Sequence, residues 1–323
     1  MMAAEIVTVS QIDDGTRLQR WIVRNYPSMP LREFYRLCRG GQIRVNSKRV
    51  HGREVLNAGD AIRIPPTIAG FATKLHKSSA GDKYSLSDLE ELRKCIIHND
   101  DDIVVFNKPA GLAVQGGTGI RKSVDKMAAA LFPYDKISLV HRLDRETSGL
   151  LVVAKNQRAA QHLSAQFQNK DAHKEYLALL NGNVKPMRGV IDNYMVKGQV
   201  FDSPERLNGG SGQRAQRAIT NYQVLANAGN ISWVLFSPKT GRTHQLRMHS
   251  AITLGAPIVG DALYGRNYPV DEALSSILAT NNLFLFAYKL TFQHPSTGRM
   301  MTMRAAVPDF MMPVIKLLEL KVP

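Results

Sequence analysis

A histidine and four charged side chains crowd into residues 141 to 146, the first six residues of the stretch HRLDRETSGLLVVAKN at 141 to 156. The run from Leu150 to Ala154 has the length and composition of a buried strand, and the Thr-Ser-Gly before it is typical of a turn. The charges are therefore expected at the edge of a sheet. Held there, the carboxylate of Asp144 could stabilise positive charge, attack an electrophilic carbon or remove a proton. The same charges could also be surface ion pairs, which are common and contribute little.

A second stretch, SPKTGRTHQLRMHSAITLGAPIVGD at residues 237 to 261, opens on a glycine turn and then begins a predicted helix. Its two histidines, His244 and His249, are five residues apart with no third ligand near them, so the spacing does not indicate a zinc site. The string GGTGIRK at residues 116 to 122 lacks the GK(S/T) ending of a phosphate-binding loop. We therefore predict neither a metal nor a nucleotide cofactor.

A third stretch, DAHKEYLALLNG at residues 171 to 182, places a tyrosine at the start of an alternating strand. Tyr176 offers a flat ring that could stack on a base and a phenol that could exchange a proton. A single tyrosine at such a position is also a common aromatic at the edge of a core.

The composition favours a globular protein with a polyanionic partner. The 323 residues are 44% apolar, enough for a sizeable core and two domains. Lysine and arginine number 42 against 27 acidic residues, and the formal charge of +15 favours nucleic acid. Two cysteines cannot build a disulfide framework, which fits a reducing cytoplasm. Without an apolar run of about 18 residues or a signal peptide, we expect a cytoplasmic protein, a monomer, with no membrane segment.

The first domain is predicted at residues 15 to 66. RLQRWIVRNYP and PLREFYRLCRG have helical spacing, and QIRVNSKRVHGREVLNAGDAIRIPP alternates around turn formers as short antiparallel strands do. An arginine-rich helix face beside a basic hairpin suits RNA phosphates, although such a face can also be merely solvated. The predicted RNA-binding residues are Arg32, Arg36, Arg39, Arg44, Lys48 and Arg49.

Residues 67 to 88 lose periodicity and gain serine, glycine and lysine, which predicts a flexible linker. The second domain, residues 89 to 323, mixes strands such as DIVVFNK, GLLVVAK and ISWVLFS with helices such as SVDKMAAALF and QRAAQHLSAQFQ. Strict strand-helix-strand alternation is missing. We therefore predict the α+β class, with a mixed, mostly antiparallel sheet flanked by helices.

Four stretches taken together resemble the successive motifs of the RluA-type pseudouridine synthases in order and spacing: DDIVVFNKPAGLAVQGG, HRLDRETSGLLVVAKN, KEYLALLNG and TGRTHQLRMHSAITLGAPIVGD. The basic helix followed by GQIRVNSKRV and AGD resembles the S4 RNA-binding domain. Together the two resemblances cover nearly the whole chain. They imply an isomerase that needs no cofactor. It would convert uridines of large-subunit ribosomal RNA to pseudouridine during ribosome biogenesis.

The resemblance also implies roles for individual residues. Asp144 matches the essential aspartate, Tyr176 the tyrosine that stacks on the target base, and Arg247 the arginine that pairs with the aspartate. Arg142 matches the arginine that fills the space left by the flipped base. The other motif residues expected to contact or shape the substrate cleft are Lys108, His141, Arg242 and Gln245, together with Pro109, Thr147 and Gly149.

The implied reaction breaks the bond from ribose C1′ to N1, turns the base and rejoins it through C5. Nothing is oxidised and no group is added. The base must first leave its stack, which costs a few kcal/mol. The sequence leaves open whether Asp144 attacks C1′, removes a sugar proton or stabilises positive charge on the sugar.

Two other functions fit parts of the sequence. A catalytically inactive RNA-binding factor for ribosome assembly would explain the charge equally well, but it predicts that Asp144, Tyr176 or Arg247 should be missing, and all three are present. A glycosidase would need two carboxylates on either side of one bond. Asp144 and Glu146, two residues apart on a turn, do not suit that geometry.

Overall fold

The computed structural model describes residues 4–10, 13–26, 29–71, 84–196, 199–202, 215–266 and 282–323. The chain divides into two compact units. The first unit comprises residues 1–106, 115–141 and 152–163, and the second comprises residues 107–114, 142–151 and 164–323. Strands β6 (Ile103–Lys108) and β8 (Ser148–Ala154) each have residues in both units.

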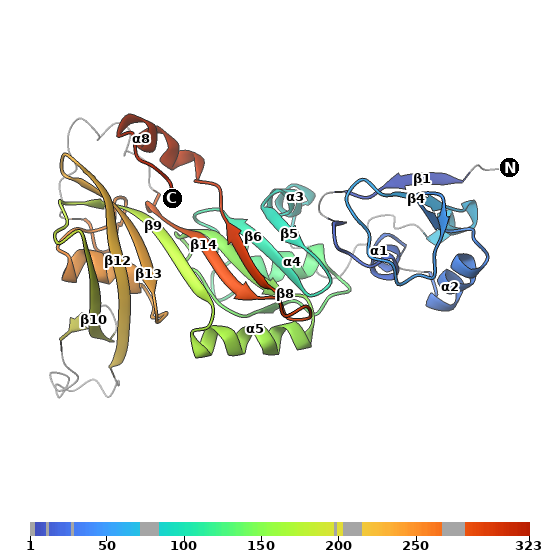
Figure 1. The fold of residues 1–323 in the computed structure, drawn as a ribbon, viewed down its shortest axis with the longest axis horizontal. Coiled ribbons are helices and arrows are strands. Elements are labelled where there is room, and N and C mark those ends of the chain that lie inside the picture. Colours follow the sequence, from blue (N-terminus) through green and yellow to red (C-terminus); the bar gives the residue numbers. More distant parts are fainter. Residues whose placement is uncertain are drawn as a thin grey trace. The chain divides into compact units, whose positions relative to one another are not determined.

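Residues 4–71 of the first unit form what we call the N-terminal module. The predicted helices are present as α1 (Leu18–Asn25) and α2 (Leu31–Arg39). A small antiparallel sheet has the strand order β1–β4–β2–β3; β1 and β4 are labelled in Figure 1. Its strands are β1 (Glu5–Thr8), β2 (Arg44–Val45), β3 (Lys48–Arg49) and β4 (Ala61–Ile64). Between β2 and β3 the backbone of Asn46 and Ser47 has positive φ angles of 49° and 66°, as a tight hairpin turn requires.

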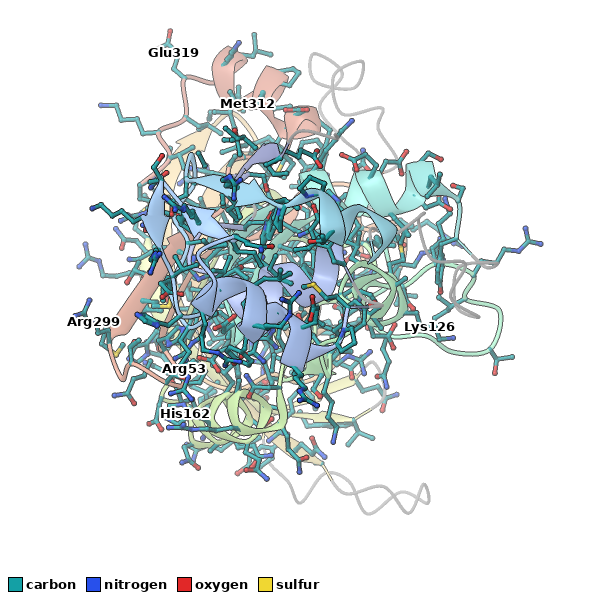
Figure 2. The ribbon with its side chains drawn as sticks, turned by 90° about the vertical axis from the view of Figure 1, so that its right-hand side faces the viewer. Arg53, Lys126, His162, Arg299, Met312 and Glu319 are labelled. Carbon is teal, nitrogen blue, oxygen red and sulfur yellow. The ribbon has the colours of Figure 1, made fainter. Side chains whose placement is uncertain are left out.

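The core of this module explains why its helices form. The apolar faces of α1 and α2 are buried, and Ile22 and Phe34 are fully shielded from solvent. On α2 the basic residues Arg32, Arg36 and Arg39 are exposed, away from this apolar face. Arg53, labelled in Figure 2, is likewise exposed, in the segment after β3.

The observed elements extend past the predicted domain bounds on both sides. β1 begins at Glu5, before the predicted start at residue 15. The sequence does not predict this strand, because a four-residue edge strand is too short to show a clear period. A 3₁₀ turn at Pro66–Phe71 runs from the last residue of the predicted first domain into the predicted linker, and residues 72–83 of that linker lie outside the described residues. Helix α3 (Leu86–Lys94) starts inside the predicted linker. It begins at Ser85, whose hydroxyl accepts a hydrogen bond from the backbone of Asp88 in a capping box.

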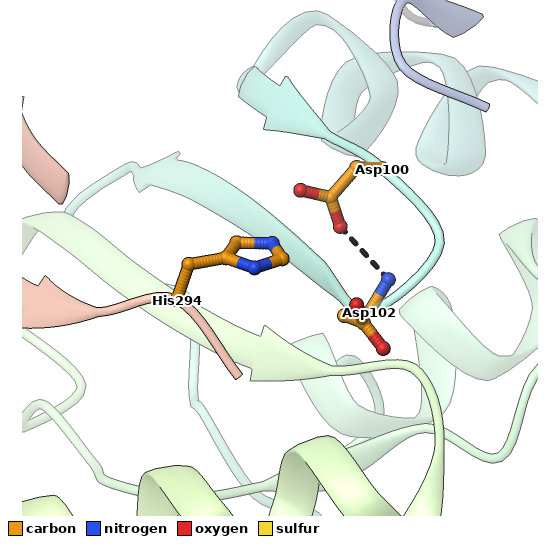
Figure 3. A group of neighbouring side chains, drawn as sticks. All are labelled: Asp100, Asp102 and His294. Atoms are coloured by element: carbon orange, nitrogen blue, oxygen red, sulfur yellow. Dashed lines mark hydrogen bonds between the residues drawn. The ribbon is translucent and has the colours of Figure 1, made fainter. Parts of the chain in front are cut away.

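The rest of the first unit contains β5 (Ile96–Asn99), which pairs antiparallel with β6, and β7 (Ser138–Leu139), which pairs antiparallel with the end of β8. Helix α4 spans Val124–Leu131. In the turn between β5 and β6, the carboxylate of Asp100 accepts hydrogen bonds from the backbone N–H groups of Asp102 and Ile103 at 2.8 and 2.9 Å (Figure 3). The same carboxylate lies 2.7 Å from the ring nitrogen Nε2 of His98. These contacts fix the turn.

In the second unit the strands have the order β11–β10–β12–β13–β9–β14–β8, with β15 paired to β14 (Figure 1). Among the described strands in this order, the β14–β8 pair is parallel and the other neighbours are antiparallel. The strands are β9 (His173–Asn181), β10 (Arg188–Val196), β11 (Gln199–Phe201), β12 (Gln216–Ala228), β13 (Ile231–Pro238), β14 (Leu285–Gln293) and β15 (Met300–Arg304). The prediction of an α+β chain with a mixed, mostly antiparallel sheet is confirmed.

Short helices accompany this sheet: α5 (Gln157–Asn169), which both units share, α6 (Gln245–Met248) with a further turn at His249–Thr253, and α8 (Met312–Leu317) after a turn at Asp309–Met311. Beyond β14, the ring nitrogen Nδ1 of His294, also labelled in Figure 3, faces the backbone N–H groups of Ser296 and Thr297 at 3.3 and 3.2 Å.

The core of the second unit determines where the polar residues lie. Its largest fully buried side chains include Trp233, Phe236, Phe284 and Phe286. Along β9 the C-terminal residues are buried, whereas the residues from His173 to Tyr176 are exposed or half-buried. The first half of β9 is therefore open to a ligand. Within the described part of the chain, no helix is long and apolar enough to cross a membrane.

Candidate active site

Asp144 lies in a tight turn immediately before β8. Its carbonyl accepts a hydrogen bond from the backbone N–H of Thr147 at 3.1 Å, and its side chain is half-buried. The next residue anchors the turn, because the carbonyl of Arg145 accepts from the backbone N–H of Gly111 at 3.0 Å and from the ammonium of Lys108 at 3.0 Å. The carboxylate of Asp144 is thus carried on a fixed backbone.

Lys108 is fully buried and takes a structural position. Besides Arg145, its ammonium donates to the carbonyls of Pro109 and Leu112, each at 2.9 Å. Charge-assisted hydrogen bonds of this kind are about twice as strong as neutral ones. The three carbonyls come from two segments 37 residues apart, so Lys108 ties the loop after β6 to the turn that carries Asp144. Lys108 is predicted to bind the substrate, but it is buried and supports the turn of Asp144 instead.

Gly149 allows β8 to start close to β14. Its φ angle is +103°, a conformation that side chains disfavour. A Cβ atom at this position would lie 2.3 Å from the carbonyl oxygen of Ala287 and 2.6 Å from its nitrogen. Glycine is therefore the one residue type that fits this close approach at the start of β8.

Tyr176 lies on β9 opposite Phe236 of β13 and Ala287 of β14. Burial and then the negative charge of Asp144 raise the pKa of the Tyr176 phenol above its usual range. Two conclusions follow. Asp144 lies close enough to Tyr176 for its negative charge to disfavour the ionised form of the phenol, and the phenol stays protonated at neutral pH.

Arg247 forms its hydrogen-bonded ion pair with a different aspartate from the one predicted. The guanidinium binds the carboxylate of Asp261 with two parallel hydrogen bonds of 2.7 and 2.6 Å, and both side chains are almost completely buried. Burial opposes the charge of Arg247, but Asp261 and then Asp144 outweigh it and raise the pKa of the guanidinium. Asp144 therefore acts on Arg247 through space, while Asp261 fixes its orientation.

Two further residues belong to this group and carried no prediction as site residues. His244 has a left-handed backbone with φ 55°, and its Nδ1 lies 3.0 Å from the hydroxyl of Tyr264. The guanidinium of Arg247 lies over the Tyr264 ring, 5.2 Å from its centre. Burial lowers the pKa of His244, and the charge of Asp144 opposes that shift. The strained backbone of His244 is typical of functional sites.

A sequence signal for this group was present but incomplete. Asp261 ends the stretch that carries Arg247, and Tyr264 follows three residues later. The backbone N–H of Tyr264 donates a hydrogen bond of 3.0 Å to the Asp261 carboxylate. An aspartate just before a turn commonly binds the backbone beyond it. Its pairing with Arg247 required the fold.

The other predicted cleft residues have mixed positions. Gln245 is buried, and its amide binds the Thr240 hydroxyl at 2.8 Å and the Arg242 backbone N–H at 3.0 Å, so it holds the turn before α6. Arg242 and Arg142 are exposed and available to a ligand. In the first unit, the Nε2 of His141 accepts from the backbone N–H of Val152 at 2.9 Å.

The predicted RNA-binding residues gather on the N-terminal module. Arg32, Arg36 and Arg39 are exposed along α2, and Arg36 pairs with Glu33 at 2.5 Å. On the hairpin, Lys48 and Arg49 are exposed. The last of the set, Arg44, lines a groove with a second arginine, Arg63; the other lining residues are Ile6, Gly41, Gln42, Ser47 and Ala61.

Asp144 thus lies half-buried near a neutral tyrosine and a fixed arginine, and among the described residues its carboxylate forms no ion pair. Comparisons identify the family of the chain. The family model described as RNA pseudouridylate synthase matches residues 102–251. The chain is 35% identical over 303 residues to ribosomal large subunit pseudouridine synthase C of Vibrio parahaemolyticus, covering 93% of this chain and 92% of that one. It is 34% identical over 308 residues to the protein of the same name from Escherichia coli O157:H7, covering 95% and 94%.

A solved structure agrees with these relatives. The human protein titled RNA Pseudouridylate Synthase Domain Containing 4 superimposes with a TM-score of 0.60 at 27% identity, covering 73% of this chain and 97% of that one. The chain belongs to the RNA pseudouridylate synthase family. It is an RNA pseudouridine synthase, an isomerase.

Proposed function

We propose that this enzyme converts specific uridines of large-subunit ribosomal RNA to pseudouridine. The relatives that align over nearly their whole length carry that substrate in their names. The observation that carries the proposal is the placement of Asp144 beside Tyr176 at the open half of β9, where a flipped base can lie on the ring.

The residues divide the work as follows. Asp144 is the carboxylate that acts on the ribose, and Tyr176 provides the stacking face for the uracil with a neutral phenol near it. Arg247, held by Asp261, keeps a fixed positive charge near Asp144. Arg142, exposed beside Asp144, fills the vacancy left by the flipped base.

The N-terminal module is proposed to be an S4-type RNA-binding domain. On α2 Arg36 pairs with Glu33, whereas Arg32 and Arg39 are exposed, and the hairpin adds the exposed Lys48 and Arg49. Contacts with phosphates fix orientation and contribute affinity, while the second unit selects and rearranges the uridine. We place the enzyme in the cytoplasm as a monomer that acts during ribosome biogenesis.

The test is a map of pseudouridines in ribosomal RNA from cells with and without this gene. Specific sites in large-subunit RNA should lose pseudouridine when the gene is deleted. Sites should return with a plasmid copy of the parent gene but not with one encoding Asp144→Asn. Unchanged maps would support an inactive assembly factor in place of a synthase.

A further inference from the structure

A cavity of about 230 Å³ lies beside β9 in the second unit. We call it the lysine cavity, because three lysines and a histidine contribute to its wall. Its one carboxylate, Glu175, pairs with Lys289 at 3.3 Å. The lining residues are Lys170, Ala172, His173, Lys174, Glu175, Asn221, Ser237, Pro238 and Lys239.

Among the residues that the structure describes, the three lysines of the cavity have no partner. Within the described residues, no acceptor lies within hydrogen-bonding distance of the ammonium groups of Lys170, Lys174 and Lys239. Lys174 is half-buried, and burial lowers the pKa of its ammonium. An unpaired charge removed from water is costly, so natural proteins pair such groups or use them for a ligand. An anion is the ligand that would offset this cost.

The position of the cavity relates it to the active site. Lys174 and Tyr176 are two residues apart on β9, so their side chains leave the same face of the strand roughly 7 Å apart. A Cβ atom built on Gly241 would lie 3.9 Å from the Lys174 ammonium. Lys174 therefore reaches the turn that carries Arg242 and leads to His244. Lys174 thus connects the cavity with the face of β9 that carries Tyr176.

We propose that the lysine cavity binds a phosphate of the RNA backbone next to the flipped uridine, an inference that rests on the proposed function. Lysine ammonium groups suit phosphate oxygens as point charges. The side chains of Asn221 and Ser237 add neutral donors at the wall. The roughly 7 Å from Tyr176 to Lys174 along β9 is within reach of the phosphate that neighbours a nucleotide whose base lies on Tyr176. The cavity thus positions the nucleotide without contacting the reacting atoms.

The test compares full-length variants. Lys170→Ala with Lys239→Ala removes two exposed lysines, and Lys174→Gln removes the half-buried one. The matched control, Lys316→Ala with Lys321→Ala, removes two exposed lysines of the same unit outside the cavity. Binding of a short oligouridylate is titrated against salt. Turnover is measured on an unmodified transcript of large-subunit ribosomal RNA.

Loss of one phosphate contact should flatten the slope of log K against log salt by about 0.7. For both cavity variants KM should rise about tenfold, as expected for one lost charge-assisted contact, with kcat as in the parent. The control should match the parent in both assays. Because Lys174→Gln also removes an uncompensated buried charge, its melting temperature should not fall.

A second probe identifies what the cavity recognises. With a methylphosphonate oligouridylate, whose backbone is neutral, the parent and the cavity variants should bind equally. If the cavity variants bind the neutral probe more weakly than the parent by the same factor as they bind the charged one, the cavity contacts a base and the proposal is wrong. Salt slopes and KM values equal to those of the parent overturn it as well. A parent that fails to form pseudouridine refutes the proposed function alone, since the oligouridylate slopes still test the cavity.

Discussion

Replacing Gly149 by alanine should strongly destabilise the enzyme, because the start of β8 has no space for a methyl group. The new Cβ would lie 2.3 Å from the carbonyl oxygen of Ala287, and neither backbone can move without disturbing the β8–β14 pair. The φ angle of +103° costs about 1–3 kcal/mol for a residue with a side chain, and overpacking adds about 1–3 kcal/mol. The sum is about 4 kcal/mol, which corresponds to a fall in melting temperature of roughly 8–16 °C.

Gly255→Ala is the matched control. Gly255 belongs to the same unit and has a φ angle of +65°, but nothing lies within 4 Å of an added Cβ. It should lose only the conformational cost, about 1 kcal/mol, and melt roughly 2–4 °C below the parent. Thermal melts followed by circular dichroism measure both. Equal melting temperatures for the two variants would show that the close approach of β8 and β14 does not constrain the start of β8.

Three further predictions concern the site and the N-terminal module. Tyr176→Phe keeps a stacking ring, so it should form pseudouridine faster than Tyr176→Ala; parent-like activity of Tyr176→Ala would make the residue a mere core-edge aromatic. Asp261→Asn leaves Arg247 buried without its partner and should cost about 3–5 kcal/mol of unfolding free energy at neutral pH. Burial raises the pKa of Asp261, but Arg247 outweighs burial and lowers it. The stabilisation by the ion pair is therefore complete above the unfolded pKa of about 3.9 and is lost as pH falls further. A difference in unfolding free energy between variant and parent that persists at low pH in denaturant titrations contradicts this. Removing residues 1–71 should flatten the salt dependence of binding by about 3 units of slope, for about four phosphates, while turnover persists at saturating RNA; an unchanged slope means that the basic face is only solvated.

The sequence predicted those elements whose period is strong and local. The helices α1, α2, α4 and α5 and the strands β6, β8 and β13 follow the spacing of their apolar residues. β1 was missed because it is a short edge strand with little buried surface. The start of α3 was missed although Ser85 and Asp88 have the spacing of a capping box.

The sequence predicted the candidate site only in part, because it could not show in which direction individual side chains point. Motif residues marked the turn of Asp144 and the strand of Tyr176. That Lys108 points inward depends on a carbonyl 37 residues away, and that Arg247 pairs with Asp261 depends on a turn 14 residues later. The lysine cavity combines β9 with parts of β12 and β13, so no single stretch of sequence could indicate it.

The central claim is that Asp144 performs the chemistry. Asp144→Asn removes the charge and keeps the shape, so the purified variant should melt and bind large-subunit ribosomal RNA like the parent. Its rate of pseudouridine formation in single-turnover assays should fall at least about 100-fold, equivalent to roughly 2.7 kcal/mol in the barrier. A folded variant that binds the RNA and retains more than about a hundredth of the parent rate would contradict the account.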